Sequence, residues 1–110
     1  MKRAIIVDGV RTPFFKAGTI ADLNATTLGL CPVRTLIDRY PGMEEELDLV
    51  IGSNIGNQIF PPDGSNLARV ILLNADIPER VPAWTLNINC ASGLHAVLDA
   101  NNQTESGFAQ

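Results

Sequence analysis

Apolar positions along the chain fall into short patterns that alternate between strand-like and helix-like spacing. Three are strand-like: a β-branched run at 4–7, a second apolar run at 49–52, and strict alternation of apolar and polar residues over 84–89. Continuous apolar runs are typical of strands buried on both faces of a parallel sheet. Alternation indicates a strand with one core face and one polar face.

Three further stretches, 26–40, 65–74 and 91–105, show the spacing of amphipathic helices. Pro32 interrupts the first, because a proline inside a helix clashes with the carbonyl four residues earlier, at a cost of about 3 kcal/mol. The pattern therefore predicts that this helix begins near Pro32, with the proline in its first turn. Ser65 is the predicted N-cap of the second helix.

The order strand, helix, strand, helix, strand, helix predicts an α/β fold. Helices between successive strands are typical of right-handed crossovers, which leave the strands parallel and the sheet flanked by helices. A chain of 110 residues has the length of one domain, so residues 1–110 are expected to form a single unit. The predicted fold is expected to be cut off before a fourth strand of the sheet.

Composition places the chain among packed globular proteins, with 45% apolar and 18% charged residues. Eight basic against twelve acidic residues give a net charge of -4, which offers no support for a nucleic-acid partner. No apolar run approaches the roughly 20 residues that span a bilayer, so no membrane partner is expected. Two cysteines and one histidine, without metal-ligand spacing, predict reduced thiols, no metal site and a cytoplasmic location.

Cys90 is the strongest candidate functional residue, because it lies where the third strand turns into the third helix. The unpaired N–H groups and positive dipole end of a helix start favour a thiolate. The small residues Ala91, Ser92 and Gly93 leave room for a substrate carbonyl and leave N–H groups available to stabilise an oxyanion. A small buried cysteine without chemistry remains an open alternative on these grounds.

Other residues carry weaker signals. His95 follows Cys90 by five residues, about 140° around a helix, so the two are not expected to form a catalytic pair. Cys31 is expected to be a core thiol. The segment 52–56 is expected to be a turn, since it lacks the Lys-Ser/Thr of a phosphate loop, and Arg11 is expected to have a structural role.

Residues 87–97, which read Asn-x-x-Cys-Ala-Ser-Gly-Leu-x-Ala-Val, resemble the nucleophile segment of the thiolases. Residues 4–14 are similar to that family's opening strand and the Arg-Thr-Pro turn after it. Shorter segments at 66–69, 81–83 and 105–110 also fall where the family has similar residues. The likeness covers essentially the whole chain, as the first βαβαβα part of a thiolase N-terminal domain.

The resemblance implies acyl exchange with coenzyme A, in which a cysteine takes the acyl group of an acyl-CoA or 3-ketoacyl-CoA as a thioester. Only that role carries over, onto Cys90; coenzyme A thioesters are implied as substrates, and no bound cofactor is implied. The family's Asn-Glu, Gly-His-Pro and Cys-x-Gly motifs are absent from this chain. It is therefore expected to be inactive alone, and the alternative is a non-catalytic folding or dimerisation unit.

The resemblance also bears on assembly. In the family, the strand before the nucleophile pairs with the same strand of a second subunit. The polar face formed by Thr85, Asn87 and Asn89 is compatible with that pairing and equally with water. An apolar strand at an open sheet edge is a route to self-association, so we expect a homodimer or self-association and marginal stability.

Overall fold

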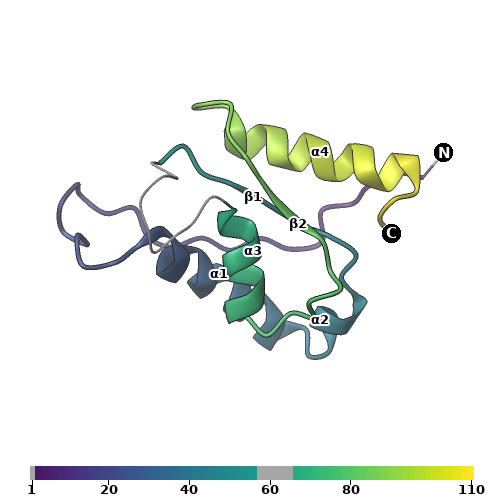
Figure 1. Ribbon diagram of the computed structural model, residues 1–110, viewed down its shortest axis with the longest axis horizontal. Coiled ribbons are helices and arrows are strands. Elements are labelled where there is room, and N and C mark those ends of the chain that lie inside the picture. The colour runs from purple at the N-terminus through teal and green to yellow at the C-terminus, as the bar shows by residue number, and fades with distance from the viewer. Residues whose placement is uncertain (1, 57–65) are drawn as a thin grey trace.

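The computed structural model describes residues 2–56 and 66–110 as helices around a small sheet. In chain order the elements are α1 (Ala25–Arg39), α2 (Met43–Glu46), β1 (Val50–Ser53), α3 (Leu67–Asn74), β2 (Ala83–Leu86) and α4 (Ser92–Ser106). The two strands are parallel, with Val50 opposite Ala83 and Ser53 opposite Leu86. Figure 1 shows α1 and α3 on one side of the strands and α4 on the other. The predicted parallel sheet with flanking helices is thus confirmed for these two strands.

Helix α3 carries the chain from β1 to β2, because parallel strands cannot be joined by a tight turn. Small residues let this helix approach closely, since a Cβ on Gly52 would lie only 3.0 Å from the Cβ of Ala68. Asn66 caps α3, its side chain accepting a hydrogen bond from the N–H of Arg69. The predicted cap, Ser65, lies outside the described residues.

The predicted first strand at 4–7 is wrong, because this segment pairs with no strand among the described residues. Ile5, Ile6 and Val7 are 82%, 81% and 80% exposed. A cavity of about 640 Å³ lies between the segment and α4. β-Branched composition favours an extended chain, but a strand forms only where a neighbouring edge supplies hydrogen bonds, and this depends on tertiary structure.

Helix α1 begins earlier than predicted, at Ala25, so Pro32 lies inside it. The Asn24 side chain caps the helix by accepting a hydrogen bond of 2.8 Å from the N–H of Thr27. Contact with α3 stabilises the turns before the proline, since Gly29 lies so close to the end of the Ile71 side chain that a Cβ there would force this side chain to shift. This packing offsets the one backbone hydrogen bond that the proline removes.

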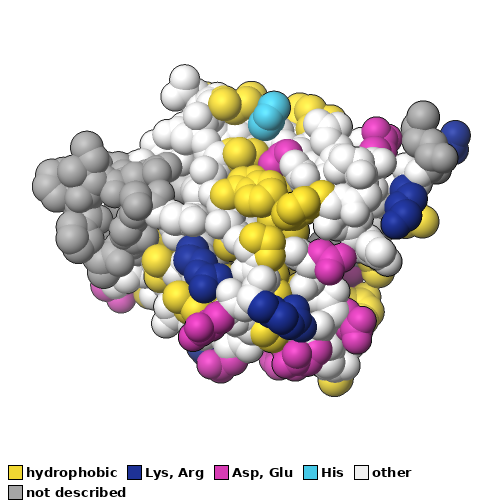
Figure 2. All heavy atoms as spheres, turned by 45° about the vertical axis from the view of Figure 1, so that its right-hand side comes forward, with side chains coloured by type: hydrophobic (Ala, Val, Ile, Leu, Met, Phe, Trp, Pro, Cys, Tyr) yellow, Lys and Arg dark blue, Asp and Glu magenta, His cyan; other side chains and the backbone are white. Residues whose placement is uncertain are grey.

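The core is small and lies around α3 and the segment that leads into β2. Its buried apolar side chains are Leu67, Ala68, Leu72, Ala75, Ile77 and Val81. Helix α4 contributes little to it, because Leu94, Val97 and Leu98 are 68%, 51% and 50% exposed. Figure 2 shows hydrophobic side chains gathered along the middle of one face, with acidic and basic side chains below them. Interactions other than apolar burial must therefore hold α4 on the sheet.

A carboxylate attaches the N-terminal segment to the end of α1. Asp8 accepts hydrogen bonds from the Gly9 N–H at 2.7 Å and from the Tyr40 hydroxyl at 2.9 Å, and its carboxylate lies 3.1 Å from Arg39. These contacts, the Gly9 hydrogen bond first, hold the pKa of Asp8 below its ordinary value of 3.8. The hydrogen bond to Asp8 raises the pKa of Tyr40.

This attachment is expected to depend on pH. Because the folded-state pKa of Asp8 is lowered, its stabilisation is fully present above about pH 4 and is lost as the pH falls through the folded-state value. In an NMR titration, the amide signals of residues 4–9 should keep their neutral-pH positions down to about pH 4 and then move toward those of an Asp8→Asn variant. Asp22→Asn, the same charge change elsewhere, is the control. If the Asp8→Asn substitution leaves the amide signals of residues 4–9 unchanged at pH 7, this result would contradict the attachment.

Candidate functional site

Cys90 lies in the short turn that joins β2 to α4. The strand ends at Leu86 and the helix begins at Ser92, with Ala91 as its N-cap residue. Cys90 therefore precedes the first helical residue by two positions, at the strand-to-helix junction where the sequence analysis expects it. Its side chain is exposed, so the alternative of a small buried cysteine does not hold.

The backbone just before Cys90 adopts a conformation that few residues tolerate. Asn89 has a φ of 60°, in the left-handed region, where asparagine is among the few side chains found with any frequency. Its N–H donates a hydrogen bond of 3.1 Å to the side-chain oxygen of Asn87. The left-handed residue turns the chain sharply from the strand into the helix, and Cys90 follows it directly.

Ser92 closes this turn from the helix side. Its hydroxyl donates a hydrogen bond of 2.6 Å to the carbonyl of Asn89 and accepts one of 2.8 Å from the N–H of Ile88. The side chain is only 3% exposed. From the sequence, Ser92 was only a small neighbour of Cys90, because these two hydrogen bonds depend on the conformation of the folded turn.

Polar and aromatic contacts fix α4 against β2 further along the helix. The indole N–H of Trp84 donates a hydrogen bond of 2.8 Å to Asp99, whose second oxygen accepts one of 3.1 Å from Gln103. The rings of Trp84 and Phe108 lie 6.3 Å apart. These contacts hold the second half of α4, and the segment that follows it, against β2.

The other residues that the sequence singled out do not join this site. His95 is exposed, one turn into α4. Cys31 is exposed on α1, where its thiol donates to the Thr27 carbonyl at 3.4 Å, so the expectation of a core thiol is wrong. The guanidinium of Arg11 lies 4.9 Å from the Phe14 ring.

Of the three residues of the predicted polar face, Thr85 is engaged within the chain, whereas Asn87 and Asn89 are exposed. The Thr85 hydroxyl donates a hydrogen bond of 2.8 Å to the Asn66 side chain and accepts one of 2.9 Å from the N–H of Ala68. The Asn66 side chain also donates to the carbonyl of Ala83 at 3.0 Å. Thr85 therefore connects β2 to the first turn of α3, and it is not the open polar position that the alternation suggested.

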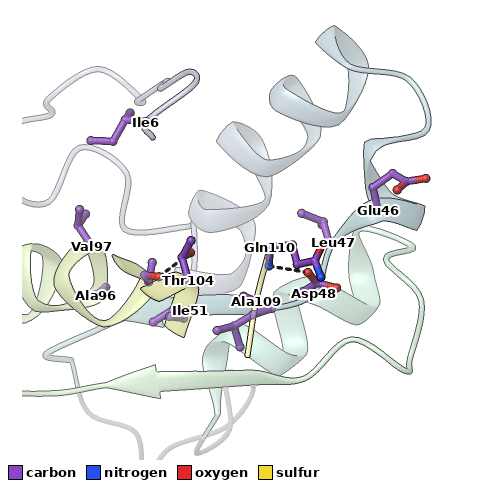
Figure 3. Close-up of a pocket in the computed structure, with 12 residues that line it drawn as sticks. Ile6, Glu46, Leu47, Asp48, Ile51, Ala96, Val97, Thr104, Ala109 and Gln110 are labelled. Carbon is purple, nitrogen blue, oxygen red and sulfur yellow. Dashed lines mark hydrogen bonds between the residues drawn. The ribbon is translucent and has the colours of Figure 1, made fainter. Parts of the chain in front are cut away.

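A cavity of about 470 Å³ lies elsewhere in the structure, and Cys90 is not among its lining residues. Ile6, Ile51, Val97 and Thr104 are among its mostly apolar lining residues, and they come from the N-terminal segment, β1 and α4 (Figure 3). At its edge, the N–H of Gln110 donates a hydrogen bond of 2.8 Å to Asp48. The cavity lies beside the segment that was predicted to be a strand, so we attribute it to the absence of that strand pairing.

Residues 2–56 and 66–110 contain neither a cluster of metal-ligating side chains nor a membrane-spanning helix. No group of three or more His, Cys, Asp or Glu side chains there could hold a metal ion. Within the same ranges, no helix has the length and apolar character needed to cross a membrane.

Comparison with known proteins agrees with the resemblance of the nucleophile segment. The profile of the family described as "Thiolase, N-terminal domain" matches residues 4–110. The chain belongs to the thiolase family.

Curated relatives and a solved structure place this thiolase chain in context. It is 40% identical over 111 residues to the β-ketoadipyl-CoA thiolase of Acinetobacter baylyi and 34% identical over 113 residues to a 3-ketoacyl-CoA thiolase of Escherichia coli. These alignments cover 99% and 100% of the chain but only 27% and 29% of the two relatives. The crystal structure of human mitochondrial 3-ketoacyl-CoA thiolase matches with a TM-score of 0.72 and 27% identity, over 81% of this chain and 22% of that one.

The contact between Trp84 and Asp99 predicts how this thiolase domain holds its α4 helix. Asp99→Ala should lower the free energy of unfolding by about 1–3 kcal/mol, because the indole and Gln103 lose a charged acceptor. Asp99→Asn, which keeps one acceptor oxygen, should lower the free energy of unfolding by a smaller amount. Urea unfolding followed by fluorescence is suitable, because Trp84 is the only tryptophan. Equal stability of Asp99→Ala and the unmodified chain would contradict this role.

Proposed function

We propose that this chain is the N-terminal portion of a thiolase-type acyl-CoA acyltransferase and that Cys90 is its acyl-accepting nucleophile. The observation that supports this is the exposed Cys90 thiol at the start of α4, inside the range that matches the family. The relatives are named for β-ketoadipyl-CoA and 3-ketoacyl-CoA, so the proposed substrates are coenzyme A thioesters of this class.

In the proposed step, the Cys90 sulfur attacks the carbonyl carbon of an acyl-CoA as a thiolate. The bond between that carbon and the sulfur of coenzyme A breaks, and the departing coenzyme A thiolate takes up the proton that Cys90 released. The negative charge on the carbonyl oxygen in between requires nearby donors. The Ser92 N–H already bonds the Asn89 carbonyl, so the proposed donors are the N–H groups of Gly93 and Leu94, which follow in the first turn of α4.

Acyl transfer to Cys90 is one half of a thiolase cycle, and the chain is expected to perform only that half. The family's downstream motifs, which the resemblance assigns to the remaining steps, do not occur in its sequence. Catalytic groups that act as a unit lose most of their effect together. We therefore propose acylation without turnover for the isolated chain.

A second proposed role, as a folding or dimerisation unit, is supported by the apolar surface that the described residues expose. Ile5, Ile6 and Val7 are at least 80% exposed, and the outer face of α4 carries Leu94 at 68%. Such surfaces promote association in water. We propose a homodimer or other self-associated form, and a cytoplasmic location, which fits two free thiols at Cys31 and Cys90.

Mass spectrometry after incubation with acetyl-CoA tests the nucleophile. The chain should gain one acetyl group on Cys90, at least about tenfold faster than on Cys31, because only Cys90 lies at a helix start. Cys31→Ser should keep this acylation and Cys90→Ser should lose it. Equal acylation of the two cysteines, or none on Cys90, would contradict the proposed function.

A further inference from the structure

Ser92 stands out among the polar and charged side chains of the described residues, because it alone falls in the buried class, at 3% exposure. It follows Cys90 by two positions and begins α4. Neighbouring residues of the turn, Asn89, Cys90 and Ala91, are exposed. A buried hydroxyl beneath an exposed turn can support that turn without touching what binds above it.

The two hydrogen bonds of this hydroxyl link Ser92, which follows Cys90, to two residues that precede Cys90. It donates to the Asn89 carbonyl at 2.6 Å and accepts from the Ile88 N–H at 2.8 Å. The Ser92 N–H adds a third bond, of 3.1 Å, to the same carbonyl. Residues 88 to 92 are thereby joined into a closed loop that contains Cys90.

The backbone at Asn89 needs such support. A φ of 60° is costly for a residue with a Cβ, and this conformation persists only where surrounding contacts hold it. The Ser92 hydroxyl bonds the carbonyl of Asn89 itself and the N–H of the residue before it. Without the hydroxyl, Asn89 keeps only the bonds to the Ser92 N–H and to the Asn87 side chain. We expect a return to a negative φ to become easier, which would redirect Cys90 away from the start of α4.

We infer that Ser92 is a positioning residue for Cys90, whose hydroxyl holds residues 88–92 in the conformation that presents the thiol at the helix start. This inference rests on the proposed function of Cys90 and deepens it. In this role Ser92 acts through the backbone of Ile88 and Asn89, to which its hydroxyl bonds.

The test compares the iodoacetamide alkylation rate of Cys90 with that of Cys31 in the same molecule at pH 7. The ratio in the unmodified chain should be about ten, because only Cys90 lies at a helix start. Ser92→Ala should lower the ratio at least about fivefold, and Ser92→Thr, which keeps the hydroxyl, should restore most of it. Circular dichroism establishes that each variant retains its helices.

Ser106→Ala is the matched control. The Ser106 hydroxyl also donates to a carbonyl three residues earlier, that of Gln103, and accepts from a following N–H, that of Phe108, at the opposite end of α4. Its removal should leave the ratio unchanged. If Ser92→Ala does not fold, Ser92→Thr and Ser92→Val supply the comparison, because these side chains have nearly the same shape and only threonine has the hydroxyl.

The outcomes separate the two proposals. A high ratio in the unmodified chain that Ser92→Ala preserves, or equal ratios in the threonine and valine variants, would overturn the role of Ser92 and leave Cys90 as the nucleophile. A ratio near one in the unmodified chain would overturn the proposed activation of Cys90, and the inference about Ser92 with it.

Discussion

One buried hydroxyl determines how the chain passes from β2 into α4. The Ser92 side chain bonds the backbone of Ile88 and of Asn89, and these bonds close the turn that carries Cys90. Apolar burial contributes little here, since Ser92 is the only residue of α4 in the buried class. The position of Cys90 therefore depends on a few directional bonds whose geometry is much stricter than that of apolar contacts.

Polar contacts join helices to β2 on both of its faces. On one face, the Thr85 hydroxyl contacts the first turn of α3 through Asn66 and Ala68. On the other, the Trp84 indole bonds Asp99 of α4. Successive residues of a strand point to opposite faces, so the adjacent pair Trp84 and Thr85 is suited to hold one helix each. The two-stranded sheet thus keeps α3 and α4 in place although the core is small.

The sequence predicted the parts of the fold that local signals determine. The second and third strands, the extent of α4 and the place of Cys90 follow from periodicity, from a glycine that ends α4, and from a motif. The strand at 4–7 was wrong because composition cannot tell whether a neighbouring edge is available. The start of α1 was wrong because the close contact of Gly29 with Ile71, which stabilises the turns before Pro32, exists only in three dimensions.

The candidate site, like the fold, was predictable only where local sequence signals determine it. Cys90 was predictable because a strand followed by small residues and a helix is a local pattern. The supporting role of Ser92 was not, because it depends on the left-handed conformation of Asn89, and that conformation brings the hydroxyl under the Ile88 N–H. The role of Thr85 was not predictable for a similar reason, since only the folded chain brings it to the start of α3.

The most direct test of this account is amide hydrogen exchange at Ile88 in the unmodified chain. If the Ser92 hydroxyl holds the turn, the Ile88 N–H should exchange at least about tenfold more slowly than in an unstructured peptide, although Ile88 itself is 46% exposed. Exchange of that N–H at the rate of an unstructured peptide would show that the turn is not held, and it would contradict the account of how Cys90 is presented.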